Sequence, residues 1–213
     1  MDVTTTCTSS ENRNEFIRII DAVLTQAKAL GADAVEADLG AGSGLSANVR
    51  KGQIDKLEYE RDKGIGVTVY INGQKGNANS SDFSDAALKD TVEAAVRIAQ
   101  HASRDECAGL VEAEMMAKEV PDLNLHHPWS ISPEAAIELA IECEQSAFAC
   151  DKRITNSDGV VLSTYSGTHL YGNSHGFING WNWSTHTIDC TMIAEENTGM
   201  QRDGWYSKAR DYK

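Results

Sequence analysis

Residues 65–80 most strongly limit what this chain can fold into, because two independent signals agree there. In "IGVTVYINGQKGNANS", four apolar residues alternate with small or polar ones: Ile65, Val67, Val69 and Ile71. A spacing of two places such side chains on one face of a β-strand. The Asn72–Gly73 pair that follows supplies the positive φ angles of a tight turn. The stretch therefore predicts a β-hairpin with one buried face.

Three helices are predicted around this hairpin. The first has apolar residues at three-and-four spacing and Gly31 at its C-cap position: Phe16, Ile17, Ile20, Val23, Leu24, Ala27 and Leu30. Ser84 caps a second helix that ends near His101, and we expect this helix to pack on the preceding sheet. Ser132 caps a third helix, with Pro133 at its first position.

Short strands and turns are predicted for most of the remaining chain. The segments "AVEADL", "LSANVR" and "QIDKLEYE" are separated by "GAGSG" and "KG", which are typical of turns. Residues 152–208 alternate short β-prone runs with turn signals, which indicates an antiparallel meander. The predicted elements follow the order helix, strands, helix in the first part of the chain and helix, strands in the second. This order supports one fold class. It predicts an α+β fold in which antiparallel meander sheets pack against helices.

The loss of periodicity after the second helix predicts how the chain is divided. Residues 1–106 form a helix/meander/helix unit, and residues 107–131 form an irregular connection that contains Pro121 and Pro128. Residues 132–213 form a helix followed by an antiparallel meander. The connection is the predicted internal boundary.

The acidic composition excludes some classes of partner. A net charge of -13 argues against nucleic acid and anionic membranes, since both attract basic surfaces. No apolar run approaches the ~20 residues that span a bilayer, and the first residues lack a secretory signal, so we expect a cytoplasmic protein. The five scattered cysteines include no C-x-x-C pair, and we expect reduced thiols that are mostly buried.

No motif for catalysis or metal binding stands out. His169, His175 and His186 lie in the predicted meander near Asp189 and Cys190, but strand histidines mostly form simple hydrogen bonds, and H-E-x-x-H is absent. The G-x-S-x-G elbow and the phosphate-binding glycine motifs are also missing. We therefore predict neither catalytic residues nor metal ligands in this chain.

Two pairs of residues in the meander have alternative interpretations. Glu195 and Glu196 are adjacent, so on a strand they point to opposite faces and favour a solvated strand end over a shared substrate site. Trp181 and Trp183 share a face, with Asn182 opposite. They either cover the core, which we favour, or form an aromatic wall for a partner.

Several blocks, in order, resemble one protein family. They are "KGQIDKLEYERDKGIGVTVYINGQKGNANSSD", "HHPWSISPEAAIELA", "DKRITNSDG", "YGNSHGF" and "IAEENTGMQRD". Together they resemble the PmbA (TldE) branch of the TldD/PmbA peptidases, from about Glu15 to Arg210. The resemblance implies the N-terminal region of a subunit in a zinc-dependent peptidase. It further leads us to expect that the C-terminal domain of the family is missing from this chain.

The resemblance also implies partners and a role. A homologous TldD-type subunit would supply the metal-binding histidines and hold the zinc, with no cofactor in this chain. The substrate would be an unstructured or small peptide that enters an internal cleft, and this chain would contribute assembly and enclosure.

The block "GNSHG" then predicts a strand followed by a turn that presents His175. Asn173, Ser174, His175 and Gly176 are the candidates for lining the peptide cleft, and Trp181 and Trp183 are the interface candidates. The alternative function is a non-enzymatic binding module that regulates a partner protein through a sheet edge.

Overall fold

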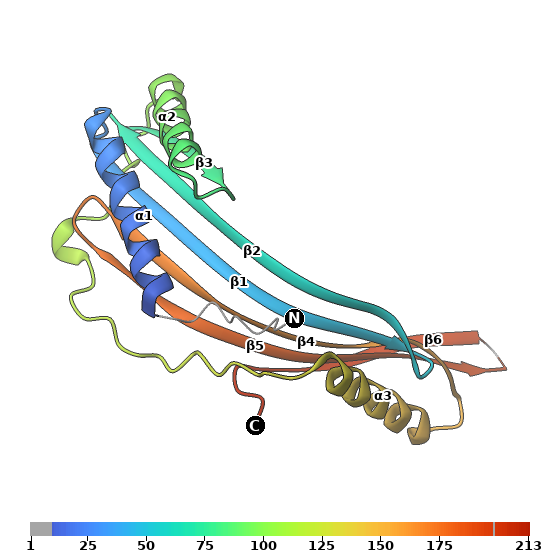
Figure 1. Cartoon of the computed structure of the whole chain (residues 1–213). Helices are drawn as coiled ribbons and strands as arrows, with labels where there is room; N and C mark the ends of the chain where they lie inside the picture. The colour runs from blue at the N-terminus through green and yellow to red at the C-terminus, as the bar shows by residue number, and fades with distance from the viewer. Residues whose placement is uncertain (1–9, 198) are drawn as a thin grey trace. The chain divides into compact units, whose positions relative to one another are not determined.

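The computed structural model describes residues 10–197 and 199–213. Helices and strands alternate as the sequence predicts, and the fold class is confirmed as α+β (Figure 1). The elements are α1 (Ser10–Ala29), β1 (Ala34–Arg50), β2 (Gln53–Ile71), β3 (Gln74–Ser80), α2 (Asp85–His101), the 3-10 helix η1 (Ala113–Met115), α3 (Pro133–Cys150), β4 (Ile154–Asn173), β5 (Ile178–Glu196) and β6 (Gly199–Ala209).

The two predicted meanders form a single sheet. Its six antiparallel strands lie in the order β3-β2-β1-β4-β5-β6. The strands β1 and β4 are neighbours although α2, the connection and α3 separate them in sequence. Pairing between such distant segments has no local sequence signal, which is why the sequence alone indicated separate sheets.

The predicted turn and helix caps are confirmed. Asn72 and Gly73 have φ angles of 52° and 75°. Ile71 pairs with Gln74 across this turn, and β3 runs antiparallel to β2. The Ser84 hydroxyl accepts a hydrogen bond from the Ala87 amide at 3.4 Å. This amide lies in the first turn of α2 and has no hydrogen-bond acceptor within the helix.

The prediction of a turn at "GAGSG" is wrong, because β1 continues through residues 40–44 without a break. Gly40, Gly42 and Gly44 do not have the positive φ angles of turn glycines. A Cβ atom added to Gly44 would collide with the Tyr165 ring on β4. Glycine at this position therefore makes room for an aromatic side chain on the neighbouring strand.

The meander of residues 152–208 is confirmed, but the prediction that its strands are short is wrong. Three strands of 20, 19 and 11 residues fill this region. The turn signal in "NSDG" produces a local irregularity at Gly159, where φ is 127°, and β4 continues past it. Strand pairing on both sides of β4 outweighs this local turn preference.

The chain separates into two compact units whose boundaries do not follow chain order. The first unit contains the described residues up to Gly42, together with Asp62–Leu123 and Gly167–Asn182. The second contains Ser43–Arg61, Asn124–Ser166 and Trp183–Lys213. The long strands β1, β2, β4 and β5 each contribute to both units. The division at residues 107–131 stays a prediction.

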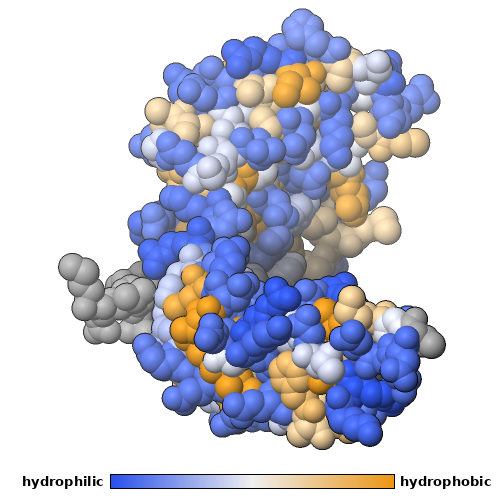
Figure 2. Space-filling view, turned by 90° about the vertical axis from the view of Figure 1, so that its right-hand side faces the viewer, coloured by the Kyte–Doolittle hydropathy of each residue, from blue (hydrophilic) through white to orange (hydrophobic). Residues whose placement is uncertain are grey.

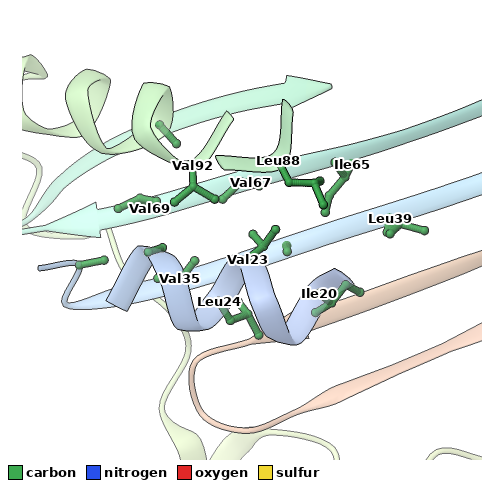
Figure 3. Packing of buried hydrophobic residues seen from close by; sticks show 14 of the residues in the cluster. Ile20, Val23, Leu24, Val35, Leu39, Ile65, Val67, Val69, Leu88 and Val92 are labelled. Carbon is green, nitrogen blue, oxygen red and sulfur yellow. The ribbon is translucent and has the colours of Figure 1, made fainter. Parts of the chain in front are cut away.

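The core of the first unit lies between its helices and its part of the sheet. Figure 3 shows side chains of α1 and α2 directed toward β1 and β2. Ile20 and Val23 of α1, Val92 of α2, Val35 of β1 and Val67 of β2 are all at most 1% exposed. Burial removes the apolar surface of each such side chain from water, which stabilises the folded state by about 1.5–3 kcal/mol per side chain. The prediction that α2 packs on the sheet is confirmed.

The second unit has its own core under α3. The residues are Leu45, Ala47, Val49, Ala136, Ala140, Val160 and Leu162. Glu144 of α3 is also buried, with 1% exposure. Its two carboxylate oxygens accept hydrogen bonds from the backbone amides of Lys51, at 2.8 Å, and Gly52, at 2.7 Å. This carboxylate therefore ties α3 to the turn between β1 and β2.

Two predictions about burial need correction. Cys107 and Cys150 are exposed, and Cys143 and Cys190 are half-buried, so the described cysteines are not mostly buried as expected; Cys7 lies outside the described residues. Trp181 is 44% exposed and does not lie in the core.

Hydrophilic residues predominate on the face shown in Figure 2, where hydrophobic residues form separate patches. Within the described residues, no helix is both long enough and apolar enough to cross a membrane.

The buried carboxylate leads to a first prediction. We expect Glu144→Gln to lower the free energy of unfolding by about 1–3 kcal/mol. The side-chain nitrogen of glutamine is a hydrogen-bond donor, so one of the two backbone N–H groups loses its acceptor. Urea denaturation measures the change. Glu142→Gln, at an exposed position on the same helix, is the matched control and should have little effect. Equal stability of the two variants would contradict this role for Glu144.

Candidate functional site

In the first unit, the side of the sheet away from the buried core carries a set of polar and aromatic side chains. We call this set the polar face and define it by Glu36, Asp38, Tyr70, His169, Tyr171, Asn173 and Trp181. Strand alternation explains it: Val35, Ala37 and Leu39 belong to the core, so Glu36 and Asp38 between them point to the other side. In the same way, Leu170 is buried in the core between His169 and Tyr171.

Glu36 lies at the centre of a hydrogen-bond network on the polar face. The Tyr70 hydroxyl donates to Glu36 Oε1 at 2.7 Å, and the Tyr171 hydroxyl donates to Glu36 Oε2 at 2.9 Å. Asn173 Nδ2 donates to Tyr171 Oη at 3.3 Å and to Met116 Sδ at 3.6 Å. Burial, together with the neighbouring Glu36 carboxylate, raises the pKa of Tyr70 well above its usual value. Tyr70 therefore stays protonated and remains a donor at neutral pH.

His169 forms a second group on the polar face. Its Nε2 lies 2.7 Å from Asp38 Oδ1, and its ring stacks on Trp181 with centroids 4.6 Å apart. His169 Nδ1 is enclosed and has no hydrogen-bond partner. No hydroxyl or thiol contacts this imidazole among the described residues, so the pair lacks the nucleophile of a hydrolase triad. The arrangement can stack and form hydrogen bonds, which suits binding.

The four predicted cleft residues form the turn between β4 and β5. Asn173 is 1% exposed, and its side-chain oxygen accepts from the His175 amide at 3.1 Å. Ser174 Oγ accepts from the Val35 amide at 3.1 Å, which ties the turn to β1. His175 and Gly176 are exposed, and Gly176 has a φ of 86°. The prediction of a strand and a turn that presents His175 is confirmed. Of the four residues, Asn173 is buried and Ser174 is half-buried, and their role in lining a cleft stays a prediction.

The two interface candidates fall in different units. Trp181 belongs to the first unit and stacks on His169. Trp183 belongs to the second unit and is half-buried. Their role at an interface stays a prediction.

The predicted histidines and carboxylates do not form a metal site. His175 is exposed, and His169 pairs with Asp38 in the first unit. His186, in the second unit, bonds through Nδ1 to the Thr164 hydroxyl at 2.8 Å and through Nε2 to the His127 carbonyl at 2.9 Å. Within residues 10–197 and 199–213, no three His, Cys, Asp or Glu side chains are arranged to hold a metal ion. The described residues therefore do not fit a zinc site.

A surface hollow in the second unit brings together the start of β4 and the end of β5. Its lining includes Asp151, Arg153, Glu195, Glu196 and Gln201. The Arg153 guanidinium pairs with Asp151 at 2.8 Å and lowers the pKa of that carboxyl to about 2. Both glutamates are exposed, as expected for a solvated strand end.

Two domain models of one family match the chain. The PmbA/TldA metallopeptidase domain 1 matches residues 35–99, and the PmbA/TldA metallopeptidase central domain matches residues 126–212. The chain belongs to the PmbA/TldD family.

Individual PmbA/TldD proteins agree with this assignment. The chain is 41% identical to Metalloprotease PmbA of Escherichia coli O157:H7 over 178 residues, which cover 84% of this chain and 40% of that protein. The match lies in the N-terminal portion of that relative.

Among solved structures, TldE from Thermococcus kodakarensis has the same fold, with a TM-score of 0.76 at 15% identity over 91% of this chain and 43% of that one. A Bacteroides thetaiotaomicron protein gives 0.84 at 17% identity over 96% of this chain and 46% of that one.

The polar face combines residues from both PmbA/TldA domains. Glu36, Asp38 and Tyr70 lie in the range matched by domain 1, whereas His169, Tyr171, Asn173 and Trp181 lie in the range matched by the central domain. Sequence reasoning missed Glu36, Asp38, Tyr70 and Tyr171. The alternation of acidic and apolar residues in "AVEADL" was a signal that Glu36 and Asp38 share a face.

A matched pair of substitutions tests the turn. We expect Asn173→Ala to lower the free energy of unfolding by about 1–3 kcal/mol, because it removes a buried amide whose hydrogen bonds to the His175 amide and the Tyr171 hydroxyl hold the turn. His175→Ala should change stability by at most about 0.5 kcal/mol, since that side chain is exposed. Thermal and urea unfolding measure both variants. A large loss of stability in His175→Ala alone would show that the histidine has a structural role.

Proposed function

We propose that this chain is the N-terminal region of a PmbA/TldE-type subunit in a zinc-dependent peptidase. The observation that carries the proposal is the match of two PmbA/TldA metallopeptidase domains to residues 35–99 and 126–212. The chain spans 40% of the length of the E. coli relative, so the activity of the complete subunit is part of this proposal. We infer a contribution to assembly and to substrate enclosure, in the cytoplasm.

The zinc is proposed to belong to a homologous TldD-type partner. The described residues offer no group of three metal ligands, and the histidines of the strands are engaged elsewhere or exposed. A catalytic zinc needs about three protein ligands and one open position for water. We therefore assign the metal chemistry to the partner and positioning to this chain.

The proposed substrate is an unstructured peptide bound through its main chain. The edge strand β6 is exposed along its whole length, which leaves backbone donors and acceptors available on its outer side. Addition of a peptide to a strand edge recognises the backbone and demands little of its sequence.

Activity should depend on the assembly. We expect the chain mixed with a TldD-type subunit to form a complex that cleaves an unstructured peptide, and the chain alone to show no cleavage. Trp181→Ala and Trp183→Ala should weaken the complex, because aromatic side chains at interfaces contribute strongly to binding. Size-exclusion chromatography and peptide turnover measure the two effects.

The control for the tryptophan variants is Ile98→Ala, which removes another exposed apolar side chain, from α2. It should leave the complex intact. Cleavage by this chain alone would contradict the division of roles. A stable complex without cleavage of any tested peptide would favour the alternative, a binding module that regulates its partner through a sheet edge.

Metal content provides an independent test. After dialysis against a weak chelator, the isolated chain should hold far less than one zinc per molecule, whereas the complex should retain zinc. Elemental analysis measures both. The proposal fails if the isolated chain keeps one zinc that is lost on replacing His169, His175 or His186.

A further inference from the structure

Two cysteine thiols meet between α3 and β5 in the second unit. Cys143 of α3 and Cys190 of β5 both pack against the same hydrophobic cluster under the helix. The two thiols lie close enough to interact electrostatically, and both are free. The two residues are far apart in sequence, so this contact exists only in the folded chain.

The surroundings of the pair favour the reduced state at rest. Burial and the adjacent Cys143 raise the pKa of Cys190 to about 11, and the carboxylates of Glu144 and Asp189 act in the same direction. A thiol with a raised pKa is a weak nucleophile at neutral pH, because the thiolate is the reactive form. Cys190 is therefore expected to react with an oxidant more slowly than an ordinary thiol.

We propose that Cys143 and Cys190 form a reversible disulfide under oxidising conditions, which covalently fixes α3 to β5. This inference is independent of the proposed peptidase role. The position of the pair gives it a consequence: Glu144, next to Cys143, holds the amides of Lys51 and Gly52 at the turn between β1 and β2. A bond between α3 and the sheet therefore also stabilises that turn.

The chemistry balances with a peroxide as oxidant. The Cys143 sulfur attacks one oxygen of hydrogen peroxide, the O–O bond breaks, and a sulfenic acid and one water form. The Cys190 sulfur then attacks the Cys143 sulfur, the S–S bond forms, the S–O bond breaks, and the thiol proton leaves with the hydroxide as a second water. The two sulfur atoms lose two electrons in total, and the peroxide accepts them.

A variant that keeps only this pair tests the proposal. Cys7, Cys107 and Cys150 are replaced by serine, and the same protein with Cys190→Ser added is the matched control. Both are treated with hydrogen peroxide, alkylated and mapped by peptide mass spectrometry. The expected product is a peptide that links Cys143 to Cys190, with Tm raised on the order of 10 °C because the bond closes a long loop. Dithiothreitol should reverse the shift, and the control should show none.

Two results would overturn the proposal. One is oxidation of Cys143 to an acid while Cys190 remains alkylatable; the other is a disulfide that leaves Tm unchanged. Circular dichroism before oxidation verifies that each variant is folded. The unmodified five-cysteine chain, mapped in parallel, keeps the test decisive if the serine variants fold poorly, since the same linked peptide should predominate there.

Discussion

The alternation of side chains along β1 organises both units. In the first unit, Val35, Ala37 and Leu39 face the buried core, and the residues between them face the other side of the sheet. In the second unit, Leu45 and Val49 of the same strand pack in the cluster under α3. Because successive side chains of a strand point to opposite faces, a shift of one residue would bury Glu36 and Asp38 and expose the apolar residues. The strand register, the cores and the polar face are thus set together.

Polar groups at buried and half-buried positions then select one arrangement from many apolar packings. Glu36 is held by two tyrosine hydroxyls, Glu144 by two backbone amides, and Asn173 by contacts within its own turn. Each group forms hydrogen bonds where it lies, and each would lose about 1–3 kcal/mol if a displaced strand or helix left it unpaired. Apolar contacts supply most of the stability, whereas these polar groups destabilise other arrangements of the strands and helices.

The described residues include groups that are suited to binding. His169 is oriented by Asp38 and stacked on Trp181, but no nucleophile or metal ligand set accompanies it among the described residues. The edge strand β6 offers backbone groups and exposed aromatic side chains, including Trp205, which is 84% exposed. We propose that these features let this chain of the PmbA/TldD family hold a partner or an extended peptide. The Cys143–Cys190 pair belongs to the second unit, whereas the polar face belongs to the first.

The sequence by itself determined the local elements. Helix caps such as Ser84 and Ser132, and the Asn72–Gly73 turn, act within a few residues, so their signals are complete in a short window. Family blocks also identified the relatives correctly. The sequence could not show that "GAGSG" continues a strand, because the reason is the Tyr165 ring on β4.

Only the tertiary structure decided which distant segments meet. It placed β1 beside β4, brought Tyr70 and Tyr171 to Glu36, and placed the free thiols of Cys143 and Cys190 near each other. The physical reason is that hydrogen bonds and packing between separate segments, such as Glu36 with Tyr70 at a separation of 34 residues and with Tyr171 at 135, depend on the register of the whole sheet. No short window of sequence contains that information.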